Sequence, residues 1–159
     1  MIEVKSFLTQ NNIEFTEHNH PAVYTCEEAE QYYKDIPGMH CKNLFLRDKK
    51  GDNYYLVVLP AAKRMDLKKF GDIVGSSKIT FGSSEALKEK LGLEPGSVSI
   101  FGLLNNAGKD VGLYIDRDVY EAEIVNFHPN VNTCTLGLNK EMFHKFLQVG
   151  GYEINIISL

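Results

Sequence analysis

Three short stretches of the sequence carry residue types that could act on a small ligand. Lys42 stands directly ahead of the apolar residues 44–46, where an ammonium group is unexpected. Residues 95–102, PGSVSIFG, place glycines and serines around a turn whose backbone N–H groups could converge on an oxyanion or a phosphate. His128 precedes a proline, which stiffens the backbone beside it. Each stretch also has an ordinary structural explanation: a lysine stem lying on apolar surface, a turn, and a loop histidine.

Histidines and cysteines suggest two other kinds of site. His18 and His20 would point the same way from a strand and could bind a metal with a third ligand such as Cys41. A thiol hydrolase could combine Cys41 or Cys134 with His128, since a neighbouring lysine can lower a thiol pKa. However, the sequence offers no further metal ligands at a recognisable spacing, and Cys134 lies in a strand-like pattern. We therefore predict no metal and no other cofactor.

The helices and strands that must position these residues are predicted from apolar periodicity, capping residues and turns. Thr25, three residues before Glu28, forms a capping-box pattern that predicts the start of a helix. Leu67, Phe70 and Ile73 are expected on the inward face of another helix. Helices are predicted near residues 4–10, 25–36, 65–75, 83–92 and 139–151. Strands are predicted at 13–15, 42–47, 54–59, 78–81, 111–116, 122–127, 133–138 and 152–158, and a turn running into an apolar strand at 95–106.

Strands outnumber helices, and several neighbouring strands are joined by links too short for parallel crossovers. The sequence therefore predicts an α+β fold with a mixed, mostly antiparallel sheet flanked by short helices. With 159 residues, the chain suits one domain over 1–159. The apolar runs are too short to span a bilayer and residues 1–10 lack a signal-peptide pattern, so we expect a cytoplasmic protein without membrane contact.

The charge and cysteine content of the sequence limit the kinds of ligand that the protein is expected to bind. A net charge of -4 argues against a generic polyanion-binding surface. The stretch 60–78 nevertheless holds five cations and only two aspartates, so it could meet a phosphate-rich ligand or the end of a nucleic acid; a solvated helix face is the plainer explanation. Three cysteines at scattered spacings do not form a disulfide framework and fit reduced thiols.

Taken together and in order, three motifs resemble the YbaK/ProX family of aminoacyl-tRNA editing domains. They are residues 42–46 (KNLFL), residues 95–98 (PGSV), and residues 127–129 (FHP) followed by Asn132 and Thr133. The likeness covers essentially the whole chain and is greatest to the freestanding prolyl-tRNA editing proteins that deacylate alanyl-tRNA(Pro). It implies a barrel-like sheet and hydrolysis of the ester between a wrong amino acid and the terminal adenosine of tRNA.

The resemblance also implies roles for individual residues. Lys42 would offset the negative charge that develops on the ester, and Gly96 and Ser97 would position the ester and the attacking water. The attack would be assisted by a ribose hydroxyl of the substrate, so no side-chain nucleophile is required. The remaining expected substrate-binding residues are Asn43, Val98, Ser99, Ile100, Gly102 and His128.

The expected partner is aminoacyl-tRNA, held by its acceptor 3′ end, with prolyl-tRNA synthetase as a further partner and a monomeric chain. A synthetase pocket rejects a smaller amino acid weakly, because one methylene is worth only ~1–3 kcal/mol, so a second, size-excluding pocket near Lys42 makes chemical sense. Two departures from the family pattern bear on that pocket: Ile100 where a loop proline is common, and Asn105–Asn106 where Asn-Asp is common. A cysteinyl- or seryl-tRNA deacylase and a non-catalytic module that binds RNA ends or nucleotides therefore remain alternatives.

Overall fold

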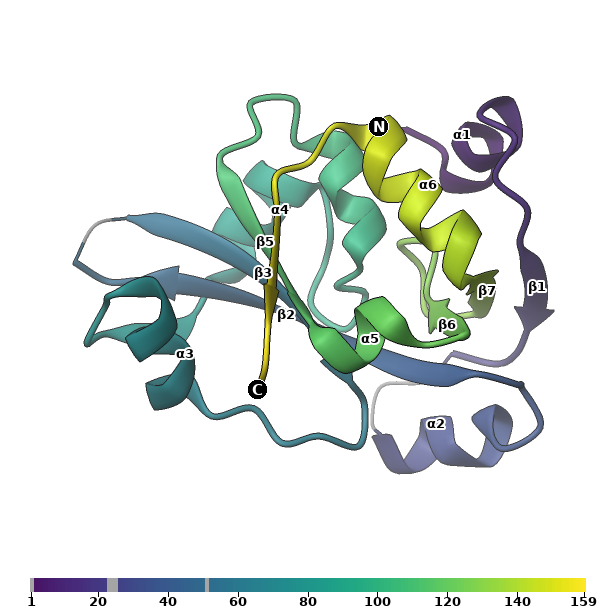
Figure 1. Cartoon of the computed structure of the whole chain (residues 1–159), viewed down its shortest axis with the longest axis horizontal. Helices are drawn as coiled ribbons and strands as arrows, with labels where there is room; N and C mark the ends of the chain where they lie inside the picture. Colours follow the sequence, from purple (N-terminus) through teal and green to yellow (C-terminus); the bar gives the residue numbers. More distant parts are fainter. Residues whose placement is uncertain (1, 23–25, 51) are drawn as a thin grey trace.

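The computed structural model describes residues 2–22, 26–50 and 52–159, and a sheet of eight strands lies at its centre (Figure 1). The strands are β1 (Thr16–Asn19), β2 (Met39–Asp48), β3 (Asn53–Pro60), β4 (Ile79–Phe81), β5 (Val111–Asp116), β6 (Ile124–Phe127), β7 (Cys134–Asn139) and β8 (Ile154–Ile157). Around them lie α1 (Val4–Gln10), α2 (Cys26–Tyr33), α3 (Leu67–Val74), α4 (Ser84–Leu91), the 3₁₀-helix η1 (Ile100–Asn105), α5 (Arg117–Glu121) and α6 (Lys140–Gly150).

The hydrogen-bonded strand order is β1-β7-β6-β2-β3-β5-β8, with β4 paired to β2 off this path. The pairs β1/β7, β6/β7, β2/β3 and β2/β4 are antiparallel, whereas β2/β6, β3/β5 and β5/β8 are parallel. This confirms the predicted α+β class with a mixed sheet in which antiparallel pairs outnumber parallel ones.

Strand β2 belongs to both halves of the sheet. Its first two residues, Met39 and His40, pair with β6, and residues 41–48 pair with β3. One hydrophobic core includes Val125 of β6 as well as Leu56 of β3 and Leu113 of β5, so both halves bend around it. The barrel-like curvature does not close, because β1 and β8 are not paired with each other in the described ranges.

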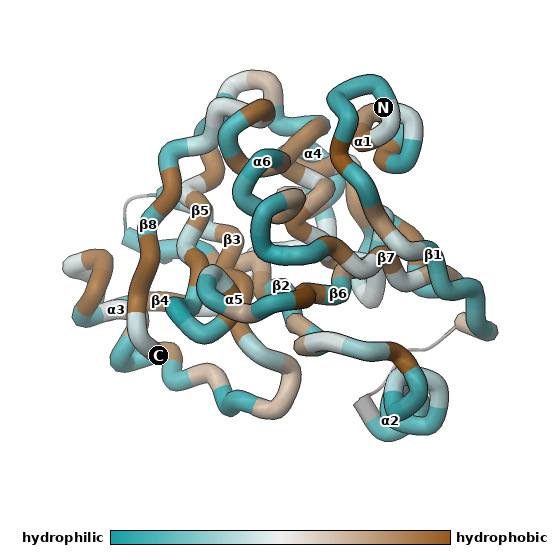
Figure 2. The backbone as a smooth tube through the Cα atoms, turned by 45° about the vertical axis from the view of Figure 1, so that its right-hand side comes forward, coloured by the Kyte–Doolittle hydropathy of each residue, from teal (hydrophilic) through white to brown (hydrophobic). Residues whose placement is uncertain are grey.

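The other face of the β2–β3 region packs against α3. Leu46, Leu59 and Phe70 are fully buried there, and the rings of Phe70 and Tyr114 meet edge-on with centroids 5.2 Å apart. Burial on both faces explains the near-continuous apolar run in β3. Hydrophobic segments accordingly gather along β3, β5 and β8, while the peripheral α2 is largely hydrophilic (Figure 2).

Local signals set most helix boundaries as predicted. The side chain of Ser83 accepts a hydrogen bond from the N–H of Ala86 and begins α4, which ends at Gly92 in the left-handed conformation. Asn139 caps α6 in the same way through the N–H of Met142. The capping box at Thr25 lies outside the described residues. No helix in the described part of the chain is long and apolar enough to cross a membrane.

Several expectations about individual elements were wrong. Residues 100–105 form the helix η1 instead of a strand, because the side chain of Ser99 accepts a hydrogen bond from the N–H of Phe101 and caps a helical turn. An apolar run buried on all sides has no period that separates helix from strand. The strand expected at 13–15 begins only at Thr16, although Ile13 is buried.

Two further differences concern the surface. Ile73 is 42% exposed, so the inward face of α3 is formed by Phe70 with the partly buried Leu67 and Val74 instead. Helix α5 was not predicted. It is only five residues long and begins where Asp116 accepts a hydrogen bond from the N–H of Asp118.

Phe101 of η1 provides a test of how the core holds this helix. Its ring is fully buried and meets the rings of Phe127 and Phe146 edge-on, at centroid distances of 5.9 and 5.1 Å. We expect Phe101→Ala to lower the free energy of unfolding in urea by about 3–5 kcal/mol, because it leaves a cavity between β6 and α6. The matched control Val149→Ala removes an exposed side chain and should change stability by less than about 0.5 kcal/mol.

Candidate active site

Lys42 lies on β2 just beyond the point where this strand leaves β6 for β3. It is paired in register with Leu59, and its side chain is half-buried. Side chains alternate along a strand, so Lys42 shares a face with His40 and Leu44. Among the described residues, no carboxylate lies within salt-bridge distance of its ammonium group. Its positive charge is therefore available to a ligand.

Asn43 faces the opposite side of β2 and holds the glycine-containing segment 95–102. Its Oδ1 accepts a hydrogen bond of 3.0 Å from the backbone N–H of Ile100. This bond joins positions 57 residues apart in the chain. The register of β2 therefore determines where the first residue of η1 lies.

A second hydrogen bond, from Ser99, connects the segment 95–102 to His128. It is fully buried, and its hydroxyl donates a hydrogen bond to the carbonyl oxygen of His128. The same hydroxyl accepts from the N–H of Phe101 at 3.2 Å. Ser99 therefore connects the loop to the end of β6, and it supports the site without being exposed to a ligand.

The turn before Ser99 requires a glycine. Gly96 has a φ of +90°, a conformation that side-chain-bearing residues rarely adopt, and the N–H of Ser97 donates to the carbonyl of Glu94 at 3.1 Å. The N–H group of the half-buried Val98 donates to no acceptor in the described part of the protein. This donor is a candidate for binding an oxyanion.

Gly102 and Ile100 contribute to packing. A Cβ atom at Gly102 would come within 2.6 Å of Leu93 Cδ1, and its N–H donates to the carbonyl of Ser99. Ile100 is completely buried in the core. The structure therefore places both residues behind the segment that a substrate would contact.

The ring of His128 is fixed at both nitrogens. Nδ1 lies 2.9 Å from the carbonyl oxygen of Cys134, which can only accept, so Nδ1 carries the proton. Nε2 then accepts from the hydroxyl of Tyr33 at 2.7 Å. Burial lowers the pKa of His128, and the nearby imidazoles of His20 and His40 lower it further. His128 is therefore a neutral, oriented imidazole at neutral pH.

Tyr33, His20 and His40 surround His128; Tyr33 and His40 were not predicted as site residues, and His20 was considered only as a metal ligand. The rings of Tyr33 and His40 stack with centroids 4.3 Å apart, and the ring of His20 is 6.0 Å from that of His128. Burial also lowers the pKa of His40. We call these four residues the histidine–tyrosine cluster. It places β1, α2, β2 and the end of β6 side by side, on the face of β2 that also carries Lys42.

The thiol and metal alternatives find little support. Burial raises the pKa of Cys41 to about 12 and also raises that of Cys134, the opposite of what an activated thiol needs. Within the described ranges, no group of three His, Cys, Asp or Glu side chains is arranged to hold a metal ion. His20 is instead hydrogen-bonded through Nε2 to the hydroxyl of Thr135 at 2.8 Å.

The basic stretch and the departure at residues 105–106 also have structural roles. Lys63 lies 2.9 Å from the buried carboxylate of Asp116 and 3.1 Å from that of Asp118, so its charge is compensated. The Nδ2 of Asn106 donates to the carbonyl of Lys90 and to Asp110, and its Oδ1 accepts from the N–H of Val111. Asn106 thereby ties η1 to α4 and β5.

Comparison with known proteins identifies the family of this chain. Residues 20–146 match the family of aminoacyl-tRNA editing domains, and the chain belongs to this family. It is 37% identical over 152 residues to the prolyl-tRNA editing protein ProX of Acetoanaerobium sticklandii, covering 96% of this chain and 93% of that protein.

The chain is also similar to one further relative and to one solved structure. The prolyl-tRNA synthetase associated domain-containing protein 1 of Mus musculus is 36% identical over 143 residues, covering 87% of this chain and 84% of that protein. A solved structure of a candidate trans-editing enzyme for prolyl-tRNA synthetase superposes with a TM-score of 0.73 at 22% identity, covering 99% and 95% of the two chains. At that identity the superposition supports the fold alone.

The hydrogen bond between Asn43 and Ile100 can be tested by substitution. Ile100→Pro removes the N–H donor and leaves the partly buried Asn43 oxygen unpaired, which should lower the free energy of unfolding by about 1–3 kcal/mol in urea denaturation. Ile100→Val keeps the donor and should cost about 0.5–1.5 kcal/mol. In an Asn43→Ala background the proline should cost less. An equal cost in both backgrounds would show that the bond does not hold the loop.

The lowered pKa values of His128 and His40 predict a pH dependence. The unfolded histidines protonate near the ordinary pKa of about 6.5, whereas the folded ones resist protonation to lower pH. Stability is therefore complete above that value and falls as the pH drops below it toward the folded-state pKa. NMR titration of the imidazole C–H signals should place both midpoints below 6.5. A midpoint at or above 6.5 for His128 would contradict the neutral, buried ring.

Proposed function

We propose that this protein is a trans-editing aminoacyl-tRNA deacylase whose main substrate is alanyl-tRNA(Pro). Its membership of the aminoacyl-tRNA editing family supports hydrolysis of an aminoacyl ester. The names of its relatives, a prolyl-tRNA editing protein and a prolyl-tRNA synthetase associated domain protein, support tRNA(Pro) as the nucleic acid and the synthetase as a partner. The proposal also accounts for the absence of a convincing nucleophile among the described side chains.

One observation carries the proposal: Lys42 is half-buried on the face of the histidine–tyrosine cluster and has no carboxylate partner among the described residues. In the proposed reaction, the oxygen of a water molecule attacks the ester carbonyl carbon, and the carbonyl oxygen becomes negatively charged. The ammonium group of Lys42 stabilises this charge in surroundings of lower polarity than water. The bond between the carbonyl carbon and the ribose oxygen then breaks, and the ribose oxygen takes up a proton.

The neighbouring ribose hydroxyl of the substrate activates the water in this proposal, so the protein supplies position and charge. Gly96 and Ser97 shape the turn that would present the N–H group of Val98 to the ester. Asn43 fixes the end of that segment. The neutral ring of His128, held by Tyr33 and by the carbonyl of Cys134, forms a rigid wall of the amino-acid pocket.

A rigid wall suits the selection that this function requires. Alanine is smaller than proline, so the synthetase cannot exclude it strongly, and a second site must accept the small amino acid and exclude the larger one. The ring of His128 cannot move aside without losing two hydrogen bonds. The extra methylenes of proline would therefore meet a fixed obstacle.

Deacylation kinetics test the proposal and the role of Lys42. Alanyl-tRNA(Pro) should lose its amino acid much faster than in buffer, whereas prolyl-tRNA(Pro) should persist. Lys42→Ala should lower kcat/KM by roughly 10²–10³-fold, the usual effect of removing one group that stabilises an oxyanion. Lys49→Ala, which removes an exposed lysine near the other end of β2, is the matched control and should leave the rate unchanged.

Other outcomes would change the proposal. If cysteinyl- or seryl-tRNA, assayed in the same way, loses its amino acid faster than alanyl-tRNA(Pro), the fold and chemistry of the proposal stand but the amino acid changes. Binding of tRNA ends by a folded sample without release of any amino acid would favour a non-catalytic module. Full activity in Lys42→Ala would refute the role of Lys42 alone.

A further inference from the structure

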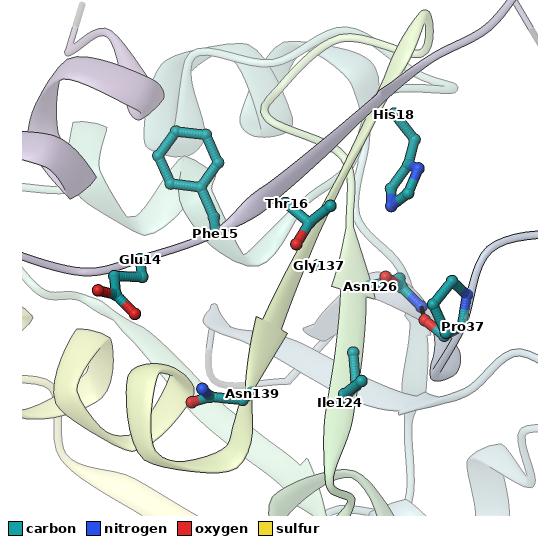
Figure 3. Close-up of a pocket in the computed structure, with 9 residues that line it drawn as sticks. All are labelled: Glu14, Phe15, Thr16, His18, Pro37, Ile124, Asn126, Gly137 and Asn139. Carbon is teal, nitrogen blue, oxygen red and sulfur yellow. Dashed lines mark hydrogen bonds between the residues drawn. The ribbon is translucent and has the colours of Figure 1, made fainter.

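A cavity of about 390 Å³ takes no part in the reaction described above, and Figure 3 shows the residues that line it. One of them, Asn126, is the register partner of His40 in the histidine–tyrosine cluster. The cavity is formed over β1, β6 and β7, and Pro37, which precedes β2, bounds one side. Its polar lining includes Thr16, His18 and Asn126. Neither Lys42 nor His128 lines it. The volume is sufficient for a small planar ligand.

Asn126 gives this cavity a specific polar group. Its side chain is only 2% exposed, and its Nδ2 donates to the carbonyl oxygen of Pro37 at 3.0 Å. Because that carbonyl can only accept, the amide orientation is fixed with Oδ1 on the other side. No donor in the described part of the chain reaches Oδ1. Buried acceptors are nearly always paired in native proteins, so this oxygen indicates a site for an N–H or O–H donor.

Gly137 leaves room for that donor. A Cβ atom at this position would lie 2.9 Å from Asn126 Oδ1, so any side chain would crowd the oxygen. The backbone of Gly137 is extended within β7, where a conformational need for glycine is absent. The missing side chain therefore leaves the buried Asn126 Oδ1 uncrowded on the side of β7.

The charges of the residues that line the cavity indicate which kind of ligand it can bind. None of the described residues that line the cavity is a lysine or an arginine, whereas Glu14 adds a carboxylate. A phosphate group has no counter-charge here and would stay outside. A neutral heteroaromatic ring with an amino group matches better, because the amino group can donate to Asn126 while His18 and Pro37 offer flat surfaces.

The cavity lies at a distance from the candidate active site that fits the end of an RNA strand. Asn126 is paired in register with His40, and His128 follows it by two residues, just beyond the end of β6, which corresponds to about 7 Å of extended chain. A ligand in the cavity would therefore lie next to the candidate active site, at the reach of one extended nucleotide.

We propose that this cavity is a nucleobase subsite for the nucleotide that precedes the esterified adenosine, with Asn126 Oδ1 accepting a hydrogen bond from an exocyclic amino group of the base. The inference rests on the proposed function for the identity of the RNA. Cytosine satisfies this requirement, whereas uracil presents a carbonyl oxygen in place of the amino group and would leave two acceptors facing each other.

Binding of free nucleosides tests the subsite without any need for turnover. Cytidine should shift the NMR signals of the Asn126 side-chain amide and of Gly137, and uridine should bind about tenfold more weakly, as expected for the loss of one base-specific hydrogen bond. Gly137→Ala should abolish this preference, and a circular dichroism spectrum will show whether the variant folds. Equal binding of the two nucleosides, or shifts confined to other regions, would overturn the subsite.

Kinetics with the unaltered protein give a second test that does not depend on a variant. Replacing the penultimate cytidine of alanyl-tRNA(Pro) by uridine should lower kcat/KM by about tenfold. No release from any ester would refute the proposed function and leave the nucleoside result standing. Equal rates for the two tRNAs would refute the subsite alone.

Discussion

The arrangement of the candidate site depends on a single backbone constraint, the pairing of β2 with different partners along its length. Met39 and His40 are hydrogen-bonded into the ladder of β6, and the strand then continues beside β3. The relative positions of His40, Lys42 and the end of β6 are thus set by two ladders of backbone hydrogen bonds. A shift of either register by one residue would move the charge of Lys42 to the opposite face.

Buried polar side chains then connect this strand to the loops. Asn43 holds η1, Ser99 holds the end of β6, and Asn126 holds the segment at Pro37. Each of these bonds spans a large separation in sequence and lies in surroundings from which water is largely excluded. Such bonds are strong when complete and costly when broken, so they specify one arrangement of the loops.

The sequence was sufficient to predict the parts of the molecule that depend on local signals. The strands β2 and β3, the helix α4 and the order of the three motifs around Lys42, Gly96 and His128 all follow from neighbouring residues. The resemblance to the editing family rested on those motifs, and membership is confirmed.

Contacts between residues that are far apart in the sequence could not be predicted from such local signals. Tyr33 and His128 are 95 residues apart, and nothing in either neighbourhood indicates that a tyrosine hydroxyl will orient the imidazole. Likewise, Asn126 resembles any polar residue in an alternating strand until β1 and Pro37 close a cavity around it. The helix η1 was mistaken for a strand because its burial on all sides removes the periodicity that separates the two.

The bond between Asn43 and Ile100 has a consequence for how the loop keeps its shape. A proline at that position would restrict the chain before folding as well as after it, because the ring removes conformations from the unfolded state. Isoleucine leaves the unfolded chain free, and the restriction arises only when Asn43 arrives on the completed β2–β3 ladder. The geometry of this loop therefore depends on the pairing of β2 with β3 as well as on its own glycine turn and Ser99 cap.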